Sequence, residues 1–429
     1  MTNNVNLTIA NQSLEKVLSP QSDFAVLPGR ELLDCNAVVD ALYVHVPFCT
    51  TKCHYCDFYS LAGHLDQIPR YLVALEQEIQ LQLAHFGLPE PETIFIGGGT
   101  PTLLPPADLA DLLRLLRRSI GSTRLREFTV EANPNTFDPA RAQILVKAGV
   151  DRVSFGAQSF NPAELVTLQR DHDPASVPVA VGIARHAGLE NINIDLIFGI
   201  PGQTLSSLHN SLKSALELQP DHISCYSLVY EPNTPMTARL KSGLITPMNE
   251  TLELEMFELV RETLSAAGLF RYEVSNFARP GFECQHNLRY WRGGNYLAWG
   301  PAAAGHHSGY RWKNVPSLMR YTDALLAAQP CLPVTQMEHL QGLNRWGESV
   351  ILALRLNEGL SLNTFREKTG LDAVAILADV LKKYDGLGLL LVDVETLRLS
   401  PGAVTVSDTI LADVLAAFEA AARRAAAKK

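Results

Sequence analysis

The sequence predicts an α/β protein: an incomplete (β/α)6 barrel followed by a small C-terminal winged-helix-like α+β module. Two observations predict this fold. Between residues 41 and 231, six apolar segments alternate with helix-like segments, and strands separated by helices form parallel sheets with right-handed crossovers. Near the C-terminus, short helices precede an apolar hairpin candidate at 387–400, which is typical of a winged helix. Periodicity alone does not separate a barrel from a doubly wound sheet, and the six repeated units favour the barrel.

The repeating units read in order along the chain. The predicted strands are 41–46, 93–99, 127–133, 151–158, 191–200 and 222–231. The predicted helices are 66–86, 106–118, 138–148, 175–187 and 205–218. Several helices open with proline or a polar cap, as at Asp138-Pro139, and that helix ends before Gly149.

After residue 249 the regular alternation of predicted strands and helices ends. A helix at 250–267, the segment RYEVSNFA at 271–278, a loop-rich stretch at 279–315 and a helix at 316–328 follow in order. Residues before 41 are weakly patterned, with at most a short helix at 14–18. We therefore expect four parts: an N-terminal extension (1–40), the barrel (41–240), a helix and loop-rich elaboration (241–335) and the C-terminal module (336–429).

Composition narrows the class of protein. The 429 residues are 47% hydrophobic and 19% charged, which is ordinary for a soluble globular protein. The net charge of −9 argues against a broad nucleic-acid or anionic-membrane surface, because phosphate contacts need clustered Lys and Arg. The chain shows no apolar run long enough to span a membrane and no secretory signal pattern. We expect a cytoplasmic protein without a nucleic-acid partner.

Three cysteines are crowded into eight residues of the loop after the first strand, HVPFCTTKCHYCDF. Clustered thiols in a reducing compartment more often bind metal than pair. Thiolates are the usual ligands of Fe–S clusters. Three ligands for a four-iron cluster leave one iron open, as a catalytic metal site requires. We therefore expect Cys49, Cys53 and Cys56 to bind one cluster, and Cys35, Cys225, Cys284 and Cys331 to take no part.

Two simpler interpretations of these three thiols compete with the iron–sulfur cluster. The first is a structural zinc site, which would need a fourth close ligand, for which His45 and His54 are candidates. The second is a set of three unrelated buried thiols. The cysteines alone do not exclude either one.

Polar residues follow several of the predicted strands. The loop GGGTPT (97–102) allows close approach of backbone to a ligand, and its N–H groups suit a carboxylate or phosphate, although it also suits a simple tight turn. Polar side chains at the strand ends of a barrel can form a binding site. Alternatively, they can form a ring of salt bridges around the mouth of the barrel. Here they are Glu131, Gln158, Arg170 and Asp195.

The Cys-x3-Cys-x2-Cys loop, with Tyr55 before its last cysteine, resembles the signature of the radical S-adenosylmethionine (SAM) superfamily. The resemblance implies a 4Fe-4S cluster whose open iron binds the amino and carboxylate groups of SAM. One electron from that cluster then cleaves SAM to methionine and a 5′-deoxyadenosyl radical, which abstracts a hydrogen atom from a substrate.

From about Leu42 to Phe277, and more weakly beyond, the chain is similar to the oxygen-independent coproporphyrinogen III oxidase group of that superfamily. The similarity implies that ten residues contact SAM: Tyr43, Tyr55, Gly98, Gly99, Thr100, Glu131, Gln158, Arg170, Asp195 and Val229.

Two features distinguish the branches of this group, which are dehydrogenases that decarboxylate two propionates of coproporphyrinogen III and haem chaperones. The dehydrogenases have a fourth cysteine two positions after the third, where this chain has Phe58. The segment QHNLRYW matches the HN-x-x-YW motif of the chaperones, which implies haem contacts by His286, Asn287, Tyr290 and Trp291. Histidine is a common haem ligand, and aromatic rings pack on porphyrin faces.

Alternatives to this haem site also stay open. The motif suits a packed segment in which Tyr290 and Trp291 belong to the core, and His306 and His307 are a second pair of candidate ligands. The resemblance favours a protein that binds haem and transfers it to an acceptor protein, with an electron donor for its cluster. A coproporphyrinogen III dehydrogenase and a radical enzyme with another substrate are the alternatives.

Overall fold

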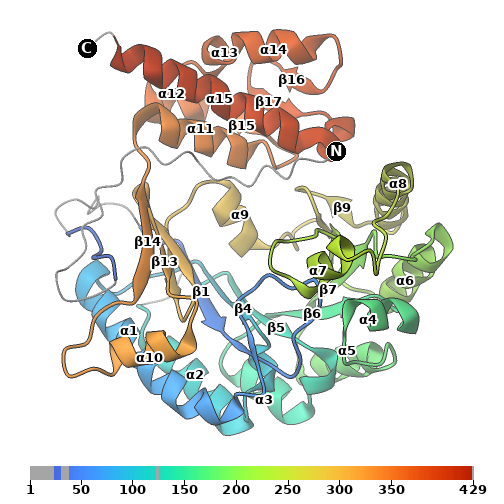
Figure 1. Cartoon of the computed structure of the whole chain (residues 1–429), viewed down its shortest axis with the longest axis vertical. Helices are drawn as coiled ribbons and strands as arrows, with labels where there is room; N and C mark the ends of the chain where they lie inside the picture. The colour runs from blue at the N-terminus through green and yellow to red at the C-terminus, as the bar shows by residue number, and fades with distance from the viewer. Residues whose placement is uncertain (1–23, 30–37, 122–124, 428–429) are drawn as a thin grey trace.

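The main body of the protein is a single curved sheet with helices on its outer side (Figure 1). The computed structural model describes residues 24–29, 38–121 and 125–427. The expected short helix at 14–18 and Cys35 lie outside the described residues, as does most of the expected N-terminal extension. None of the helices in the described part combines the length and apolarity that crossing a bilayer requires.

Six neighbouring strands of this sheet are parallel and confirm the predicted barrel units. They are β1 (Ala41–Val46), β4 (Thr93–Gly98), β5 (Glu127–Ala132), β6 (Arg152–Gln158), β7 (Asn191–Phe198) and β8 (His222–Ser227). The connecting helices are α1 (Ile68–Phe86), α2 (Pro106–Arg118), α3 (Pro139–Lys147), α5 (Ser176–Ala187) and α6 (Leu205–Glu217). Between β6 and α5 the structure adds a short helix that the sequence did not predict, α4 (Pro162–Leu168).

The sheet extends beyond these six strands on both sides. β11 (Tyr296–Trp299) pairs in parallel with β1, and antiparallel strands follow it: β12 (Ala304–His307), β13 (Tyr310–Asn314) and β14 (Val334–His339). At the other edge, β8 pairs with β10 (Asn276–Ala278), which pairs with β9 (Phe270–Arg271). The twelve strands form one open series, so the barrel is incomplete.

The prediction that 279–315 is loop-rich is therefore wrong. This stretch contains α9 (Gln285–Trp291) and three strands of the main sheet. Strands of four or five residues with mixed polar and aromatic side chains give no clear period-2 signal, and their pairing with β1 is a contact between distant parts of the chain. Three further helices lie outside this stretch: α7 (Pro235–Lys241) and α8 (Glu250–Ala266) before it, and α10 (Leu318–Leu325) after it.

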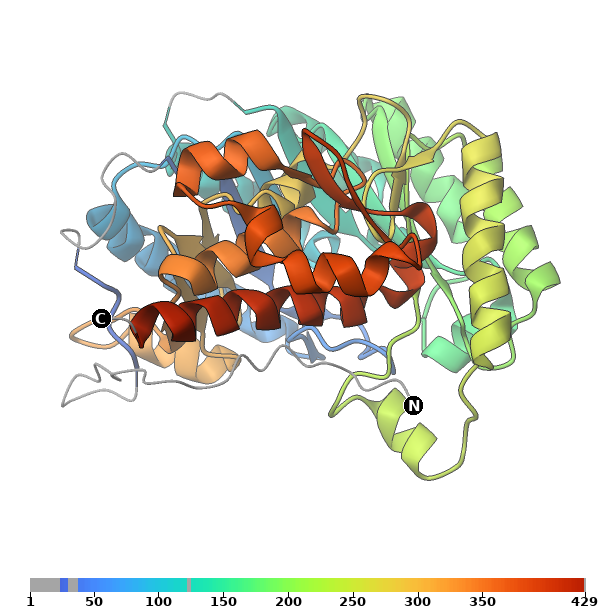
Figure 2. The ribbon, with the colours of Figure 1, turned by 90° about the horizontal axis from the view of Figure 1, so that it is seen from above.

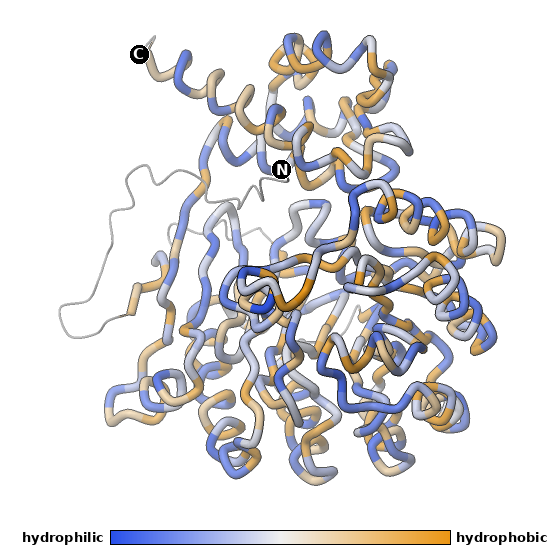
Figure 3. The backbone as a smooth tube through the Cα atoms, turned by 45° about the vertical axis from the view of Figure 1, so that its right-hand side comes forward, coloured by the Kyte–Doolittle hydropathy of each residue, from blue (hydrophilic) through white to orange (hydrophobic). Residues whose placement is uncertain are grey.

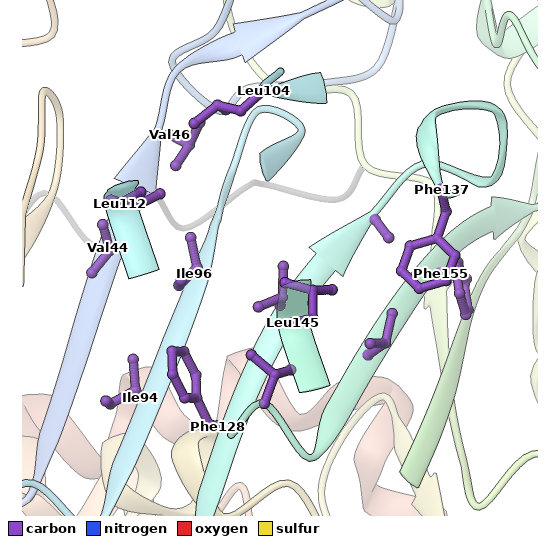
Figure 4. Close-up of a cluster of buried hydrophobic side chains, with 14 of the residues drawn as sticks. Val44, Val46, Ile94, Ile96, Leu104, Leu112, Phe128, Phe137, Leu145 and Phe155 are labelled. Atoms are coloured by element: carbon purple, nitrogen blue, oxygen red, sulfur yellow. The ribbon is translucent and has the colours of Figure 1, made fainter. Parts of the chain in front are cut away.

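The hydrophobic core of this body lies between the sheet and its covering helices. Figure 4 shows Val44, Ile96 and Phe128 from three neighbouring strands together with Leu112 of α2 and Leu145 of α3, all fully buried. Burying one such side chain contributes about 1.5–3 kcal/mol. In Figure 3 the helices alternate between hydrophobic and hydrophilic residues, as amphipathic helices on a sheet do. The apolar core thus lies between the outer face of the sheet and the helices. The inner face of the sheet carries other side chains.

The C-terminal module has a hydrophobic core of its own. It comprises α11 (Gly342–Ala353), β15 (Leu360–Ser361), α12 (Leu362–Thr369), α13 (Ala373–Ile376), α14 (Ala378–Asp385), β16 (Leu390–Val392), β17 (Thr396–Leu399) and α15 (Ser407–Ala426). β16 and β17 form the hairpin expected near the C-terminus, and β15 pairs with β17.

This module covers the main body on one side (Figures 1 and 2). The guanidinium of Arg355 lies 4.9 Å from the centre of the Trp291 ring, and Arg292 forms a 3.0 Å ion pair with Glu358. Both contacts reach α9 or the residue after it, so α9 joins the barrel to the module.

Candidate functional site

The cysteine loop leaves β1 and is closed by two short strands, β2 (Phe48–Cys49) and β3 (Leu61–Ala62), that pair in parallel. One hydrogen bond within the loop and one to α4 help to fix it. Lys52 Nζ donates to the Phe58 carbonyl at 2.5 Å, and the His54 amide donates to the Leu168 carbonyl at 3.1 Å. The loop thus lies at the carboxyl end of the parallel strands, where barrel proteins carry their sites.

The three thiols line one cavity. The Thr100 hydroxyl donates to Cys49 Sγ at 3.8 Å, and Arg170 Nη1 donates to Cys53 Sγ at 3.6 Å. Burial raises the pKa of the Cys56 thiol to about 11 and also raises the pKa of Cys49. A bound metal cation counters this effect, because coordination deprotonates thiols, and the two donors stabilise the resulting thiolates.

The donor set suits a cluster better than one zinc ion. Among the described residues, no three His, Cys, Asp or Glu side chains are placed to hold a single ion. A four-iron cluster contacts each thiolate through a different iron, so its ligands need not converge, whereas zinc needs four that do. Both ring nitrogens of His45 are engaged, by the Tyr43 hydroxyl at 3.0 Å and the Tyr59 carbonyl at 2.7 Å.

The glycine loop after β4 approaches protein atoms rather than open space. A Cβ on Gly99 would lie 2.5 Å from the Phe48 carbonyl oxygen, and Gly98 has φ +104°. The amide of Gly98 donates to Glu131, that of Gly99 to Val46, and that of Thr100 to Phe48. Of the two roles that the loop suits, these hydrogen bonds favour the tight turn for these three N–H groups; the glycines let β4 pack against the cysteine loop and so set the position of Cys49.

The cavity has a volume of about 600 Å³ and brings together most of the expected cofactor residues. It is lined by Cys49, Cys53, Tyr55, Cys56, Gly98, Gly99, Thr100, Glu131, Gln158, Arg170, Asp195 and Val229. Tyr43 does not line it; its hydroxyl donates to His45, and its ring stacks on Phe95, which does.

The backbone is irregular where β6 reaches this cavity. Gln158 has φ +64°, in the left-handed region that residues other than glycine seldom adopt, and the register with β7 shifts between Gly156 and Gln158. Such irregularities gather at binding sites, where they re-aim side chains.

The charged groups of the cavity are enclosed but partly unpaired. Burial, and then the nearby Asp195 charge, raise the pKa of Glu131 to about 7. Burial also raises the pKa of Asp195, although Ser154 and Asn193 donate to it at 3.0 and 2.7 Å. Arg170 donates to the Gly156 carbonyl at 2.6 Å, while its Nε is buried without a partner. An orphaned buried donor beside three thiols fits a site made for a polar ligand.

Sequence reasoning missed a deeper layer of polar residues in the barrel. Arg152, Ser154, Asn193 and Ser224 also line the cavity, below the strand ends. The signal was present in DRVSFGAQ and NINID, where polar and apolar residues alternate. Buried parallel strands are ordinarily apolar on both faces, so this alternation marks an inner face that is polar.

The HN-x-x-YW motif forms α9, which lies against the amino ends of the strands. His286 is 1% exposed, and its ring nitrogens bond Thr93 Oγ1 at 2.9 Å and the Tyr290 hydroxyl at 2.8 Å. Burial lowers the pKa of His286 to about 3. Asn287 lines the cavity, whereas Trp291 faces Arg355 of the C-terminal module.

The second histidine pair lies elsewhere, on β12. His306 Nδ1 donates to the Gly294 carbonyl at 2.9 Å, and its Nε2 lies 3.3 Å from the Gly309 amide. His307 is buried, with Nδ1 3.0 Å from the Ser308 hydroxyl. Neither histidine lines the cavity.

Comparison with known proteins identifies both parts of the chain. Residues 43–215 match the family model of the radical SAM superfamily, and residues 340–406 match that of the HemN C-terminal domain. A solved structure from Escherichia coli, coproporphyrinogen III oxidase (HemN), superposes with a TM-score of 0.78 at 23% identity, covering 91% of this chain and 92% of that one. At that identity the likeness establishes the fold.

Relatives with higher sequence identity show the family as well as the fold. The heme chaperone HemW of Bacillus subtilis is 39% identical over 349 residues, which cover 81% of this chain and 92% of the relative. The protein of the same name from Mycobacterium tuberculosis is 39% identical over 353 residues, covering 82% and 90%. The chain therefore belongs to the HemW family of the radical SAM superfamily.

Proposed function

We propose that this protein is a haem chaperone, which binds haem and delivers it to an acceptor protein with the help of a 4Fe-4S cluster and SAM. The observation that carries the proposal is the 39% identity to proteins named heme chaperone HemW over about nine-tenths of their length. The three cysteines that line the cavity supply the ligand set that a radical SAM cluster requires.

Cys49, Cys53 and Cys56 are our proposed cluster ligands. Arg170 and Thr100 hold two of these sulfurs through hydrogen bonds, and the pairing of β2 with β3 holds the loop. When bound, the cluster supplies one electron for the reductive cleavage of SAM. The protein's own contribution is to leave one iron without a cysteine ligand and to enclose the adjoining cavity.

SAM would occupy the upper part of that cavity. We propose that Glu131 accepts from its amino group and that Gln158, Arg170 and Asp195 bind its other polar groups, with Tyr55, Val229 and the residues Gly98, Gly99 and Thr100 forming the walls. Tyr43 would act through His45 and Phe95 rather than by direct contact.

Haem binding is assigned to the region of the HN-x-x-YW motif, with His286, Asn287, Tyr290 and Trp291 as contributors. His286 would support the site by holding α9 in place, since direct ligation of iron requires breaking one of its two hydrogen bonds. His306 or His307 remains the alternative ligand. The acceptor protein and the electron donor complete the expected set of partners.

The state of the cysteines indicates the cellular compartment of the protein. The six cysteines in the described part of the chain are all free thiols, which favours a reducing compartment, and we propose the cytoplasm. We also propose that the chain works as the four parts 1–40, 41–240, 241–335 and 336–429.

A haem titration tests this proposal. The protein is prepared anaerobically with its cluster, and haem is added while the Soret band is followed. We expect saturation near one haem per chain, and subsequent transfer of that haem to a second, haem-free protein. No saturable Soret band would contradict the proposal.

The runner-up function is an oxygen-independent coproporphyrinogen III dehydrogenase. The residue at position 58 disfavours it, because this chain has an exposed phenylalanine where that branch has a fourth cysteine. Release of CO2 from coproporphyrinogen III under reducing conditions, without haem binding, would establish the runner-up instead.

A further inference from the structure

The cavity continues below the proposed cofactor site to a buried cationic floor. On β6 the inward residues are Arg152, Ser154, Gly156 and Gln158, and all four line the cavity. At about 3.3 Å per residue, Arg152 lies roughly 20 Å along the strand from Gln158 and roughly 13 Å from Gly156. The cysteine loop and the expected cofactor residues are at the opposite, carboxyl end.

Arg152 is an unusual group to find in this position. Its side chain is 2% exposed, its Nε is buried without a partner, and no residue in the described part of the chain forms a hydrogen bond or ion pair with it. A guanidinium stays charged at all physiological pH values, and buried arginines are almost always paired. Thr129, its register neighbour on β5, also has a buried hydroxyl without a partner.

Two carboxylates whose charges act on Arg152, those of Glu127 and Asp195, accept hydrogen bonds from other groups. Glu127 accepts from the amides of Gln285 and His286 at 2.8 and 3.1 Å, and so caps α9. Asp195 accepts from Ser154 and Asn193. The surrounding charges raise the pKa of Arg152 despite its burial, but no hydrogen bond or ion pair in the described part of the chain holds the guanidinium, which lines the cavity.

We propose that the floor of the barrel is a binding subsite for a carboxylate group, held by Arg152 with the Asn287 side chain beside it. A planar guanidinium binds a carboxylate through two parallel hydrogen bonds, and Asn287, which also lines the cavity, can add a third donor from its side-chain amide. Glu131 and Asp195 line the same cavity, and where they are ionised they repel a phosphate dianion more strongly than a singly charged carboxylate.

This subsite is distinct from the site proposed for SAM, whose carboxylate belongs beside the cysteine loop. It also does not depend on haem binding. Two sources of the carboxylate share this chemistry: a free small acid that enters the barrel, and a propionate of haem.

The test uses the cluster-loaded protein without haem, titrated with sodium propionate and, separately, with neutral propionamide. Ligand-observed NMR reports the dissociation constants. We expect propionate to bind and propionamide to bind at least tenfold more weakly. Equal binding of the two, or no binding of either, would overturn the proposal, as would competition between propionate and SAM.

Variants locate the site. Arg152→Met is expected to weaken propionate binding at least tenfold, Arg152→Lys less, and Asn287→Ala by a few-fold, while Arg114→Met on the exposed face of α2 leaves it unchanged. Arg152→Met should lower the Tm of the ligand-free protein only modestly, because nearby charges stabilise the guanidinium but none of those groups forms a hydrogen bond with it. A markedly lower Tm would assign Arg152 to the fold and overturn the subsite; if that variant does not fold, the propionamide and Asn287→Ala results decide.

Haem and haem dimethyl ester distinguish the sources. If propionate competes with haem but not with the ester, the floor receives a haem propionate. If it competes with neither, the ligand is a free acid. Both results support the subsite.

Discussion

The imidazole of His286 and the hydroxyl of Thr93 are joined by a 2.9 Å hydrogen bond that fastens α9 to the first residue of β4. Tyr290 engages the other ring nitrogen. The histidine of the HN-x-x-YW motif is thus a buried tie between the motif and the barrel, while Asn287, the next residue, faces the cavity.

Thr93→Val breaks this tie without altering the histidine. A buried ring nitrogen left without a partner costs about 1–3 kcal/mol. We expect the free energy of unfolding, measured in urea, to fall by that amount. Thr167→Val, which removes a hydroxyl bonded to a helix carbonyl on α4, is the control and should change stability little. Equal stability of both variants would mean that the bond does not anchor α9.

His286→Ala should weaken haem binding by releasing α9, and Thr93→Val should weaken it in the same way. The position of the Soret maximum should stay the same in both variants. His209→Ala, on the exposed face of α6, is the control. A Soret maximum that moves in His286→Ala alone would instead make His286 a ligand of the haem iron.

Cys53→Ala should abolish reconstitution of about four irons per chain, because cluster ligands are thiolates and two remaining cysteines do not hold the cluster. Cys331→Ala, which removes a thiol far from the loop in sequence, should load iron as the wild type does. Iron and sulfide are measured after anaerobic reconstitution. Full loading of Cys53→Ala, or zinc in place of iron in the wild type, would refute the ligand assignment.

Asp195→Ala should weaken SAM binding about ten- to a hundredfold, since a hydrogen bond to a charged group contributes about 1.5–3 kcal/mol. The cluster should remain intact. Equilibrium dialysis gives the affinity, with Asp111→Ala on the exposed face of α2 as the control. Unchanged affinity would leave Asp195 with a structural role in the network of Ser154 and Asn193.

Glu131 should make SAM binding depend on pH. Burial raises the pKa of its carboxyl to about 7, so in the ligand-free protein it is largely protonated below that pH. Only the ionised form attracts an ammonium group, so affinity should fall as pH is lowered below 7, by at most about tenfold per unit. Glu131→Gln should flatten the profile between pH 5.5 and 7.5. An identical profile in this variant would exclude Glu131 as the cause.

The same shift has a consequence for stability. The folded protein keeps the Glu131 proton between pH 4.5 and about 7 while the unfolded chain loses it. Stability contributed by this group therefore declines as pH rises through that window. Glu131→Gln should remove this part of the decline in urea unfolding.

The fold was largely predictable because its barrel is built from local patterns. α2 occupies the predicted residues 106–118, since its proline start and apolar periodicity are both strong. β8 ends at Ser227 rather than at 231, because the apolar residues beyond it serve the cavity wall and not the sheet. The strands within 279–315 escaped prediction, since a strand that adds to β1 from more than two hundred residues away has no local signature.

The residues of the candidate site also fall into two groups, those with a local sequence signal and those without one. The cysteine spacing is local, so the cluster residues could be proposed from sequence alone. Arg152 could not, because its significance comes from the absence of a partner in three dimensions. The glycine loop lines the cavity as its sequence suggested, but its amides bond Glu131, Val46 and Phe48, partners that only the folded chain brings together.

One comparison tests the central claim most directly. A single anaerobic, cluster-loaded preparation is divided and given either haem, or coproporphyrinogen III with SAM and a reductant. A haem chaperone should develop a saturable Soret band near one haem per chain and release no CO2 from coproporphyrinogen III. Release of CO2 with no Soret band would contradict this account and make the protein a coproporphyrinogen III dehydrogenase.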